Sequence, residues 1–492
     1  MLKLKKKEIK NESLEKNAFY NGVKQFCTII FPLISFMYCS RILGEEQLGK
    51  YSFGQSIIAY MLLISGLGIP NYAVREGARY RNNRNQITNF VNEVFSINII
   101  LTIIAYFILF VCVIGNTKIE QYKYVIVIQS LQIILTTLGT DWLNSIYEDF
   151  FYLMIRYIFT QIVCLIGLIL FVKRPEDIYI YTFISVLANS GGNILNFFYL
   201  RKKGFRIRFT LKINIRQHLR SILILFFNSV ASVIYLNSDI TMIGLFLNDS
   251  EVGIYTVSSK IYTMVKTLIN AVIMVTVPRF STYVANKEFA EYKKKLSEIM
   301  NILILLIIPV TIGLFMEAEN IITIIAGSSY IRGISIVKIL CIAIIFAVFS
   351  CFFSYSILLP NKMEFEFMIA TLVAAIVNIL SNVVLIPQLG INGAAYTTLF
   401  AEMVVFALGY KYTKKITTLS INHINIVSST IGGVVVGGGC IICKSLIKNP
   451  WLSLVLAIII SIILYDTTLK RLHNPYVSKL CILPRIVKYE KK

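Results

Sequence analysis

The sequence predicts an all-α polytopic membrane protein with about 14 transmembrane helices. Three observations support this fold class: the composition, the length of the apolar runs, and a motif that occurs twice. Hydrophobic residues make up 56% of the 492 residues and the mean hydropathy is +0.71, which is too apolar for a soluble chain of this size. Because the apolar runs are continuous rather than alternating, a transmembrane β-barrel is excluded.

The apolar runs define the predicted helices. Stretches such as VFSINIILTIIAYFILFVCVIG reach the roughly 20 residues that cross a bilayer. The predicted spans lie near residues 17–40, 51–70, 88–114, 121–141, 150–172, 178–200, 219–246, 252–277, 296–316, 333–358, 364–386, 392–411, 424–446 and 451–469. Lys and Arg are concentrated in the segments that face the cytoplasm if both termini are inside. The positive-inside rule therefore favours a multi-pass protein with both termini cytoplasmic.

The repeated motif divides these spans into two sets. LGEEQLGKY (43–51) aligns without a gap with LNDSEVGIY (247–255). Each copy falls in the short outer loop between the first and second helix of a six-helix set. Because six is even, both sets cross the membrane in the same direction, which is a parallel repeat. We therefore expect two six-helix lobes followed by two extra C-terminal helices.

This plan sets the expected domain boundaries. They are a basic cytoplasmic N-terminus (1–16), an N-lobe of spans 1–6 (17–215), a C-lobe of spans 7–12 (216–420), an extra helix pair (421–470) and a basic cytoplasmic tail (471–492). The basic segments are explained by membrane orientation and attraction to anionic lipid. Nucleic-acid binding is not expected, because Lys and Arg cluster in loops instead of along one soluble domain.

Polar residues form stripes on spans 1, 2, 7 and 8. Lys24 and Thr28 share one helical face, and the repeat aligns them with Asn228 and Ser232, whose face continues through Tyr235 and Asp239. Span 8 carries a polar series that contains Lys260 and Lys266, and Arg75 aligns with Arg279 past the helix ends. The candidate substrate-binding residues are therefore Lys24, Thr28, Arg75, Asn228, Ser232, Tyr235, Asp239, Lys260, Lys266 and Arg279.

Intramembrane charges usually face protein or a wet cavity, so a shared polar cavity explains these stripes economically. The alternative for single residues is an interhelical hydrogen bond or a snorkelling lysine. Of the four inner-face charges, Lys24, Lys260 and Lys266 are positive and Asp239 is negative, so the predicted cavity suits an anionic substrate. Asp239 is open to three roles: salt-bridge partner, cation-coupling site or substrate contact.

Catalytic and cofactor chemistry is not predicted. The nine Cys are scattered, mostly in apolar runs, so neither a metal site nor a disulfide framework is supported. GGGCIICKS (437–445) resembles a phosphate-binding loop, but Cys443 replaces the second Gly and the stretch belongs to an apolar span. We therefore expect no cofactor, no metal, no ATPase and no catalytic residue.

Several segments of the chain resemble Wzx-type polysaccharide flippases of the multidrug/oligosaccharidyl-lipid/polysaccharide exporter superfamily. They are SRILGEEQLGKYSFGQ, GLGIPNYAVREGAR, NSDITMIGLFLNDSEVGIYTVSSKIYTMV, VPRFST and IPQLGINGAAYTTLFAE. The resemblance implies a flippase that moves an undecaprenyl-diphosphate-linked oligosaccharide from the inner to the outer leaflet of the bacterial plasma membrane, for capsule, O-antigen or exopolysaccharide assembly. It also implies alternating access, and association with a glycan polymerase and glycosyltransferases of the same pathway.

The resemblance leads to a hypothesis for the site. Lys24, Lys260 and Lys266, with Arg75 and Arg279 at the cytoplasmic mouth, would engage the diphosphate, and Asn228, Ser232 and Tyr235 would meet sugar hydroxyls. An inside-negative potential would favour outward movement of negative charge by about 2.3 kcal/mol per charge per 100 mV. Coupling to Na⁺ or H⁺ through Asp239 is the rival driving force.

Three alternatives remain. A lipid II flippase and a drug or cation antiporter share the same fold, although an antiporter would favour acidic residues in its cavity. A membrane scaffold for a glycan-assembly complex would not need polar stripes on four equivalent helices.

Overall fold

The computed structural model describes residues 14–115 and 117–477, with all but a few side chains, most of these in 215–232. The predicted basic termini therefore lie largely outside the described residues. Every regular element of the described ranges is a helix, which confirms the all-α class. Twelve helical segments there are long and apolar enough to cross a membrane. One of them, Phe19–Tyr80, contains two predicted spans, and predicted span 219–246 corresponds to α10, so the chain is a multi-pass membrane protein.

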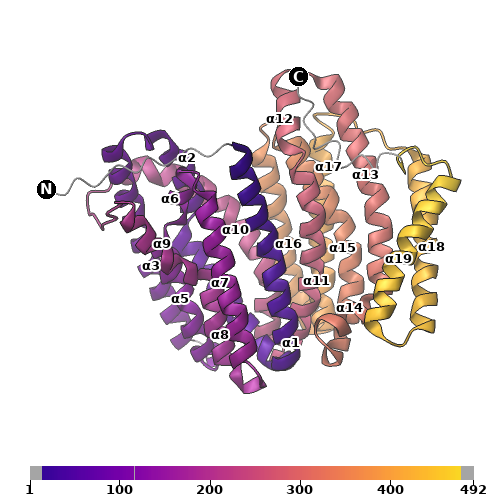
Figure 1. The fold of residues 1–492 in the computed structure, drawn as a ribbon, viewed down its shortest axis with the longest axis horizontal. Helices are drawn as coiled ribbons and strands as arrows, with labels where there is room; N and C mark the ends of the chain where they lie inside the picture. Colours follow the sequence, from indigo (N-terminus) through magenta and orange to yellow (C-terminus); the bar gives the residue numbers. More distant parts are fainter. Residues whose placement is uncertain (1–13, 116, 478–492) are drawn as a thin grey trace. The chain divides into compact units, whose positions relative to one another are not determined.

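The contacts divide the chain into two compact units, Met1–Leu245 and Phe246–Lys492. The first, unit 1, contains ten α-helices in its described part (Figure 1). They are α1 (Leu14–Gly66), α2 (Ile69–Gly77), α3 (Arg84–Ile114), α4 (Thr117–Glu120), α5 (Lys123–Gly139), α6 (Asp141–Ile146), α7 (Phe150–Phe171), α8 (Ile178–Val186), α9 (Gly192–Lys202) and α10 (Ile215–Phe246).

The second, unit 2, contains nine α-helices in its described part. They are α11 (Asp249–Met274), α12 (Val277–Ala285), α13 (Phe289–Met316), α14 (Ala318–Ile325), α15 (Ile334–Phe352), α16 (Glu364–Leu389), α17 (Ile391–Thr413), α18 (His423–Leu446) and α19 (Pro450–Arg471). The last two are the predicted extra pair, and they lie side by side, drawn in yellow in Figure 1.

Helix α10 belongs to unit 1 by its contacts. Near its start the His218 ring contacts Tyr72 and Glu93, and near its end Thr241 donates a hydrogen bond to Ser56. The contact division therefore falls at 245/246, one helix later than the repeat-based boundary at 215/216. The repeat-based boundary remains a prediction, because it concerns equivalence in sequence and not contacts.

The repeated motif interrupts the helical course of the chain in both units, with a different backbone conformation in each. In unit 1 the predicted outer loop is reduced to one residue: Gly44 has φ 71° and ψ 176°, and α1 is helical on both sides of it. In unit 2 the aligned residue is Asn248, which is extended and caps α11 by accepting a hydrogen bond from the Glu251 N–H at 3.0 Å. Only glycine adopts the Gly44 conformation readily, whereas an asparagine N-cap turns the chain without positive φ.

Equivalent helices also pack alike inside the two units. Tyr51, at the end of the motif in unit 1, packs on Tyr181 of α8, in predicted span 6, with ring centroids 4.6 Å apart. Its counterpart Tyr255 has its hydroxyl 3.3 Å from the Thr398 hydroxyl of α17, in predicted span 12. Spans 6 and 12 are partners in the predicted repeat, so the internal packing agrees with it.

The segment between α9 and α10 is held along α3. The backbone N–H groups of Arg208, Thr210 and Asn214 donate to side chains of Asn92, Ser96 and Glu93, at 2.8–3.0 Å. Arg208 and Thr210 are alternate residues, whereas Asn214 lies four residues further on and returns to Glu93, so these bonds hold the basic segment against α3.

Candidate functional site

A charged cluster lies inside unit 1, between α6, α7 and α9. The Arg156 guanidinium donates to both Asp141 oxygens, with Nη1–Oδ1 2.7 Å and Nη2–Oδ2 2.5 Å. The Asn196 amide donates to Asp141 Oδ1 at 3.0 Å and to the Gly139 carbonyl at 2.6 Å. A two-pronged arginine–carboxylate pair fixes both side chains in one plane. The arginine side chain is 7% exposed and the aspartate 43%, so the cation is the buried partner.

The local sequence makes room for this arginine. Gly192 begins α9, and a Cβ there would lie 3.4 Å from Arg156 Nε and 3.2 Å from Thr160 Oγ1. Within the described part of the chain, Arg156 Nε is buried without a hydrogen-bond partner. Lys24 on α1 interacts electrostatically with both Asp141 and Arg156. The cluster thus holds two cations and one carboxylate, which leaves one positive charge.

A second charged cluster lies inside unit 2, between α11 and α17. Lys266 Nζ lies 2.5 Å from Glu402 Oε1, and the Tyr262 hydroxyl donates to the same oxygen at 2.5 Å. Here the carboxylate is the buried partner, because the Glu402 side chain is 3% exposed and that of Lys266 22%. The Lys266 ammonium group therefore stays partly accessible at the surface of the unit, while the Glu402 carboxylate that neutralises it is buried.

Lys260 lies on α11, six residues before Lys266, and is half-buried. Among the described residues no carboxylate forms an ion pair with it. A cation on a membrane-spanning helix without a counter-charge is costly unless an anion or water reaches it. Lys260 is therefore the strongest single candidate for contact with an anionic ligand.

Asp239 is nearly buried at the end of α10, with 6% of its surface exposed. It interacts electrostatically with Tyr60, whose hydroxyl lies 3.1 Å from the Thr241 hydroxyl, which in turn donates to Ser56 at 2.8 Å. Asp239 is thus next to a chain of hydroxyl groups inside unit 1.

The remaining polar-stripe residues have different positions. Thr28 is half-buried and donates its hydroxyl to the Gln25 carbonyl, 2.6 Å away, within its own helix. Tyr235 is half-buried on α10. The side chains of Asn228 and Ser232 lie outside what the structure describes, so their predicted role stays a prediction.

Arg75 and Arg279 lie on two short helices, α2 and α12, in which the second residue is proline. Both side chains are exposed: Arg75 pairs with Glu76 at 3.2 Å, and Arg279 Nε donates to the Tyr283 hydroxyl at 3.1 Å. Arg75 is the fifth residue after Pro70, whereas Arg279 directly follows Pro278. The ungapped alignment that matched them therefore does not extend to these helices.

The reason is a difference in helix length. From the turn at Gly44, α1 runs to Gly66, whereas α11 runs from Asp249 to Met274. The helix of unit 2 is therefore longer by one turn of four residues. Past that turn the offset between the units is four residues larger than the offset of the motif.

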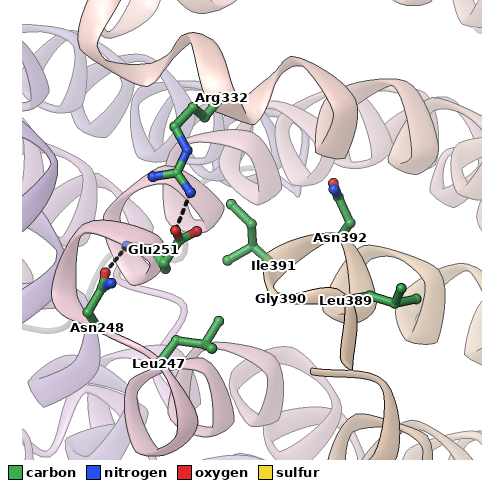
Figure 2. Close-up of a pocket in the computed structure, with 8 residues that line it drawn as sticks. All are labelled: Leu247, Asn248, Glu251, Arg332, Leu389, Gly390, Ile391 and Asn392. Atoms are coloured by element: carbon green, nitrogen blue, oxygen red, sulfur yellow. Dashed lines mark hydrogen bonds and ion pairs between the residues drawn. The ribbon is translucent and has the colours of Figure 1, made fainter. Parts of the chain in front are cut away.

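The repeated motif lines a pocket of about 380 Å³ at one end of unit 2 (Figure 2). Leu247, Asn248 and Glu251 come from the motif, and Arg332 reaches Glu251 with its guanidinium across the pocket. The opposite wall is the turn around Gly390, where α16 ends and α17 begins. None of the predicted site residues lines this pocket.

A larger cavity of about 490 Å³ runs between α13, α18 and α19 in unit 2. Its walls are almost entirely apolar, from residues such as Leu305, Val436 and Ile458, with Glu317 among the few polar ones. We call this cavity the C-terminal groove. It is formed where the predicted extra helix pair packs on the six-helix set.

Sequence reasoning missed the carboxylates of both clusters. Neither residue is among the candidates predicted from the sequence. The structure pairs Asp141 with Arg156, although the carboxylate keeps substantial exposure, and Glu402 with Lys266. No local signal links Asp141 with Arg156 or Lys266 with Glu402, because each pair is joined by packing between separate helices.

Comparison with known proteins identifies the family of the chain. The family model described as polysaccharide biosynthesis protein matches residues 14–284. The Putative O-antigen transporter of Escherichia coli (strain K12) is 23% identical over 400 residues, covering 80% of this chain and 95% of the relative. The Probable low-salt glycan biosynthesis flippase Agl15 of Haloferax volcanii is 24% identical over 249 residues, about half of each chain.

A solved structure has the same fold. Lipid II flippase MurJ in its inward closed conformation superposes with a TM-score of 0.75 over 93% of this chain and all of that chain, at 16% identity. Together these findings define a membrane transport protein rather than an enzyme. The chain belongs to the polysaccharide biosynthesis protein family, and the predicted resemblance to Wzx-type flippases is confirmed.

Proposed function

We propose that this protein moves an undecaprenyl-diphosphate-linked oligosaccharide from the inner to the outer leaflet of the bacterial plasma membrane, by alternating access. The observation that carries the proposal is Lys260, a half-buried ammonium on a membrane-spanning helix without an ion pair among the described residues. A diphosphate supplies the counter-charge that this position lacks. Family membership and the name of the Escherichia coli relative support a glycan as cargo.

Lys266 and Lys24 support binding of the same group. Lys266 stays partly exposed while Glu402 neutralises part of its charge from the buried side. Lys24 adds one positive charge to the Arg156–Asp141 pair of unit 1. We propose that these three lysines bind the diphosphate, with Arg75 and Arg279 making exposed first contacts. Polar residues of α10, with Tyr235 as the described example, would meet the sugars.

The C-terminal groove is the proposed binding site for the lipid tail. Its apolar walls match an isoprenoid chain, which gains about 0.8 kcal/mol for each CH₂ removed from water but gains little by leaving lipid for protein. Binding there would therefore orient the tail more than it strengthens affinity. Outward movement of the negative diphosphate would be favoured by an inside-negative potential, with coupling through Asp239 as the alternative.

The test is depletion of the protein in its host, followed by mass spectrometry of undecaprenyl-diphosphate glycans and a leaflet-accessibility assay. We expect one complete glycan unit to accumulate on the cytoplasmic leaflet. Complementation with Lys260→Ala should restore protein level but not export, while Lys293→Ala, an exposed lysine on α13, should restore both. Normal export by Lys260→Ala would contradict the proposed role of this lysine.

Lys266 needs a different variant, because its removal alone leaves the buried Glu402 without its cation. The double variant Lys266→Ala/Glu402→Gln removes both charges, so a loss of export at normal protein level reports on substrate binding. If depletion leaves all lipid-linked glycans unchanged and surface glycan intact, the antiporter function becomes the better explanation. Drug and cation efflux would then be measured.

A further inference from the structure

The pocket that the repeated motif lines in unit 2 contains none of the residues proposed to bind the diphosphate (Figure 2). Its volume of about 380 Å³ lies within the range of small-molecule sites, which is about 300–1,000 Å³. Its walls come from the start of α11 with the two residues before it, from a short 3₁₀-helix (Ser328–Gly333), and from the turn between α16 and α17. The predicted orientation places this end of unit 2 on the outer side of the membrane.

The charges that line this pocket balance each other. Among the eight residues of its walls, Arg332 and Glu251 are the charged ones, and they form an ion pair across the pocket. The Glu251 side chain is 13% exposed and that of Arg332 is 64% exposed, so the guanidinium group remains accessible to a ligand. Because the formal charges sum to zero, the pocket suits an uncharged ligand better than an ion.

The polar groups that remain available in the pocket are hydrogen-bond donors. Asn248 Oδ1 already accepts the Glu251 N–H at 3.0 Å, and Asn392 Oδ1 accepts the Ser335 hydroxyl at 2.7 Å. Within the described part of the chain the amide nitrogens of these two asparagines bind no acceptor, and the Arg332 side chain binds only Glu251. A ligand that fills this pocket therefore has to present acceptor oxygens.

Apolar side chains form the rest of the walls. Leu247, Leu389 and Ile391 lie between the polar groups, and Asn248 and Asn392 lie on opposite sides of the pocket (Figure 2). A sugar with an acetamido substituent matches this combination. It is uncharged, its carbonyl and hydroxyl oxygens are acceptors, and its methyl group and ring carbons are apolar.

We propose that this pocket binds an acetamido sugar of the transported glycan on the outer side of the membrane. The acetamido carbonyl accepts a hydrogen bond from Arg332, sugar hydroxyl oxygens accept from the Asn248 and Asn392 amides, and the methyl group packs against Ile391. That the sugar belongs to a transported glycan rests on the proposed function, whereas binding of a free sugar does not.

The test uses the purified full-length protein in a detergent without a sugar head group, and saturation-transfer-difference NMR with methyl N-acetyl-β-glucosaminide as the probe. We expect saturable binding, with the strongest signal on the acetyl methyl group. Methyl β-glucoside, which lacks the acetamido group, and methyl β-glucuronide, which is anionic, should bind about tenfold more weakly. Absence of saturable binding of the probe, or equal or tighter binding of either of the other two compounds, would overturn the proposal.

Two variants separate sugar binding from folding. Asn248→Asp and Asn392→Asp keep the oxygen that accepts from the Glu251 N–H or from Ser335, and each removes one amide donor. Each should weaken binding of the probe about tenfold, at a melting temperature no lower than that of the wild type. The matched control is Asn449→Asp, at the exposed N-cap of α19 and outside the pocket, which should bind like the wild type. Normal binding by the double variant Asn248→Asp/Asn392→Asp would also overturn the proposal.

The result can be distinguished from that of the depletion experiment. Accumulation of a lipid-linked glycan on the cytoplasmic leaflet, without binding of the probe, refutes the sugar pocket alone. Probe binding that the two variants weaken, with no glycan accumulation on depletion, supports the sugar pocket and refutes the proposed transport.

Discussion

The charged clusters of the two units are built from the same kinds of groups with their exposure reversed. In unit 1 the arginine is enclosed, at 7% exposure, and its carboxylate partner Asp141 is at 43%. In unit 2 the carboxylate Glu402 is enclosed, at 3%, and its partner Lys266 is at 22%. The exposed member is the group that a ligand can reach. Under the proposed function, an anionic ligand would meet a lysine in unit 2 and a carboxylate in unit 1, where Lys24 would supply the attraction.

The comparison predicts which residue of each ion pair, when substituted, causes the larger loss of folding stability. The largest effect is expected for Lys266→Met, because this substitution leaves the buried Glu402 carboxylate without its counter-charge. We expect a loss of about 3 kcal/mol, seen as a clear drop in apparent melting temperature in detergent. Glu402→Gln should lose less, because Lys266 is partly exposed. A larger loss of stability for Glu402→Gln than for Lys266→Met would contradict the conclusion that the carboxylate is the more buried partner in unit 2.

The turns of the repeated motif give the next largest effect. Gly44→Ala places a Cβ at φ 71° and ψ 176°, a conformation that is essentially restricted to glycine, so we expect a loss of about 2 kcal/mol. The counterpart Asn248→Ala removes only a helix cap, at about 1 kcal/mol. Melting temperatures of the two variants measure the difference. Equal losses would show that the two turns are energetically alike despite their different backbones.

Among the charge substitutions, the smaller effect is expected in unit 1. Asp141→Asn removes the charge that compensates the enclosed Arg156, but solvent near the half-exposed site screens part of the loss, so we expect about 1.5 kcal/mol. Arg156→Met should lose less stability than Asp141→Asn, because the Asp141 carboxylate that remains is partly exposed and can be hydrated. The order of these two variants is opposite to that in unit 2, where the cation is the costly residue. Finding the same order in both units would refute the reversal.

The fold could be predicted from the sequence to a large extent, and the site only in part. Continuous apolar runs and the repeated motif define the spans and the two sets, because hydropathy and an ungapped match are local properties. The ion pairs could not be predicted, because Asp141 meets Arg156 and Glu402 meets Lys266 only after separate helices pack. The alignment of Arg75 with Arg279 is wrong as a structural equivalence, since α11 has an extra turn that an ungapped alignment cannot show.

That extra turn has a consequence for how such duplicated chains diverge. Four residues advance a helix by about 6 Å and rotate it by about 400°. The side chains that follow an insertion of four residues are therefore rotated by only about 40° from their former direction. An insertion of two residues would instead turn the following side chains toward the opposite face. Length changes in a packed helix are therefore expected to come in whole turns. The extra turn of α11 leaves nearly the same helix face toward its neighbours on both sides of it.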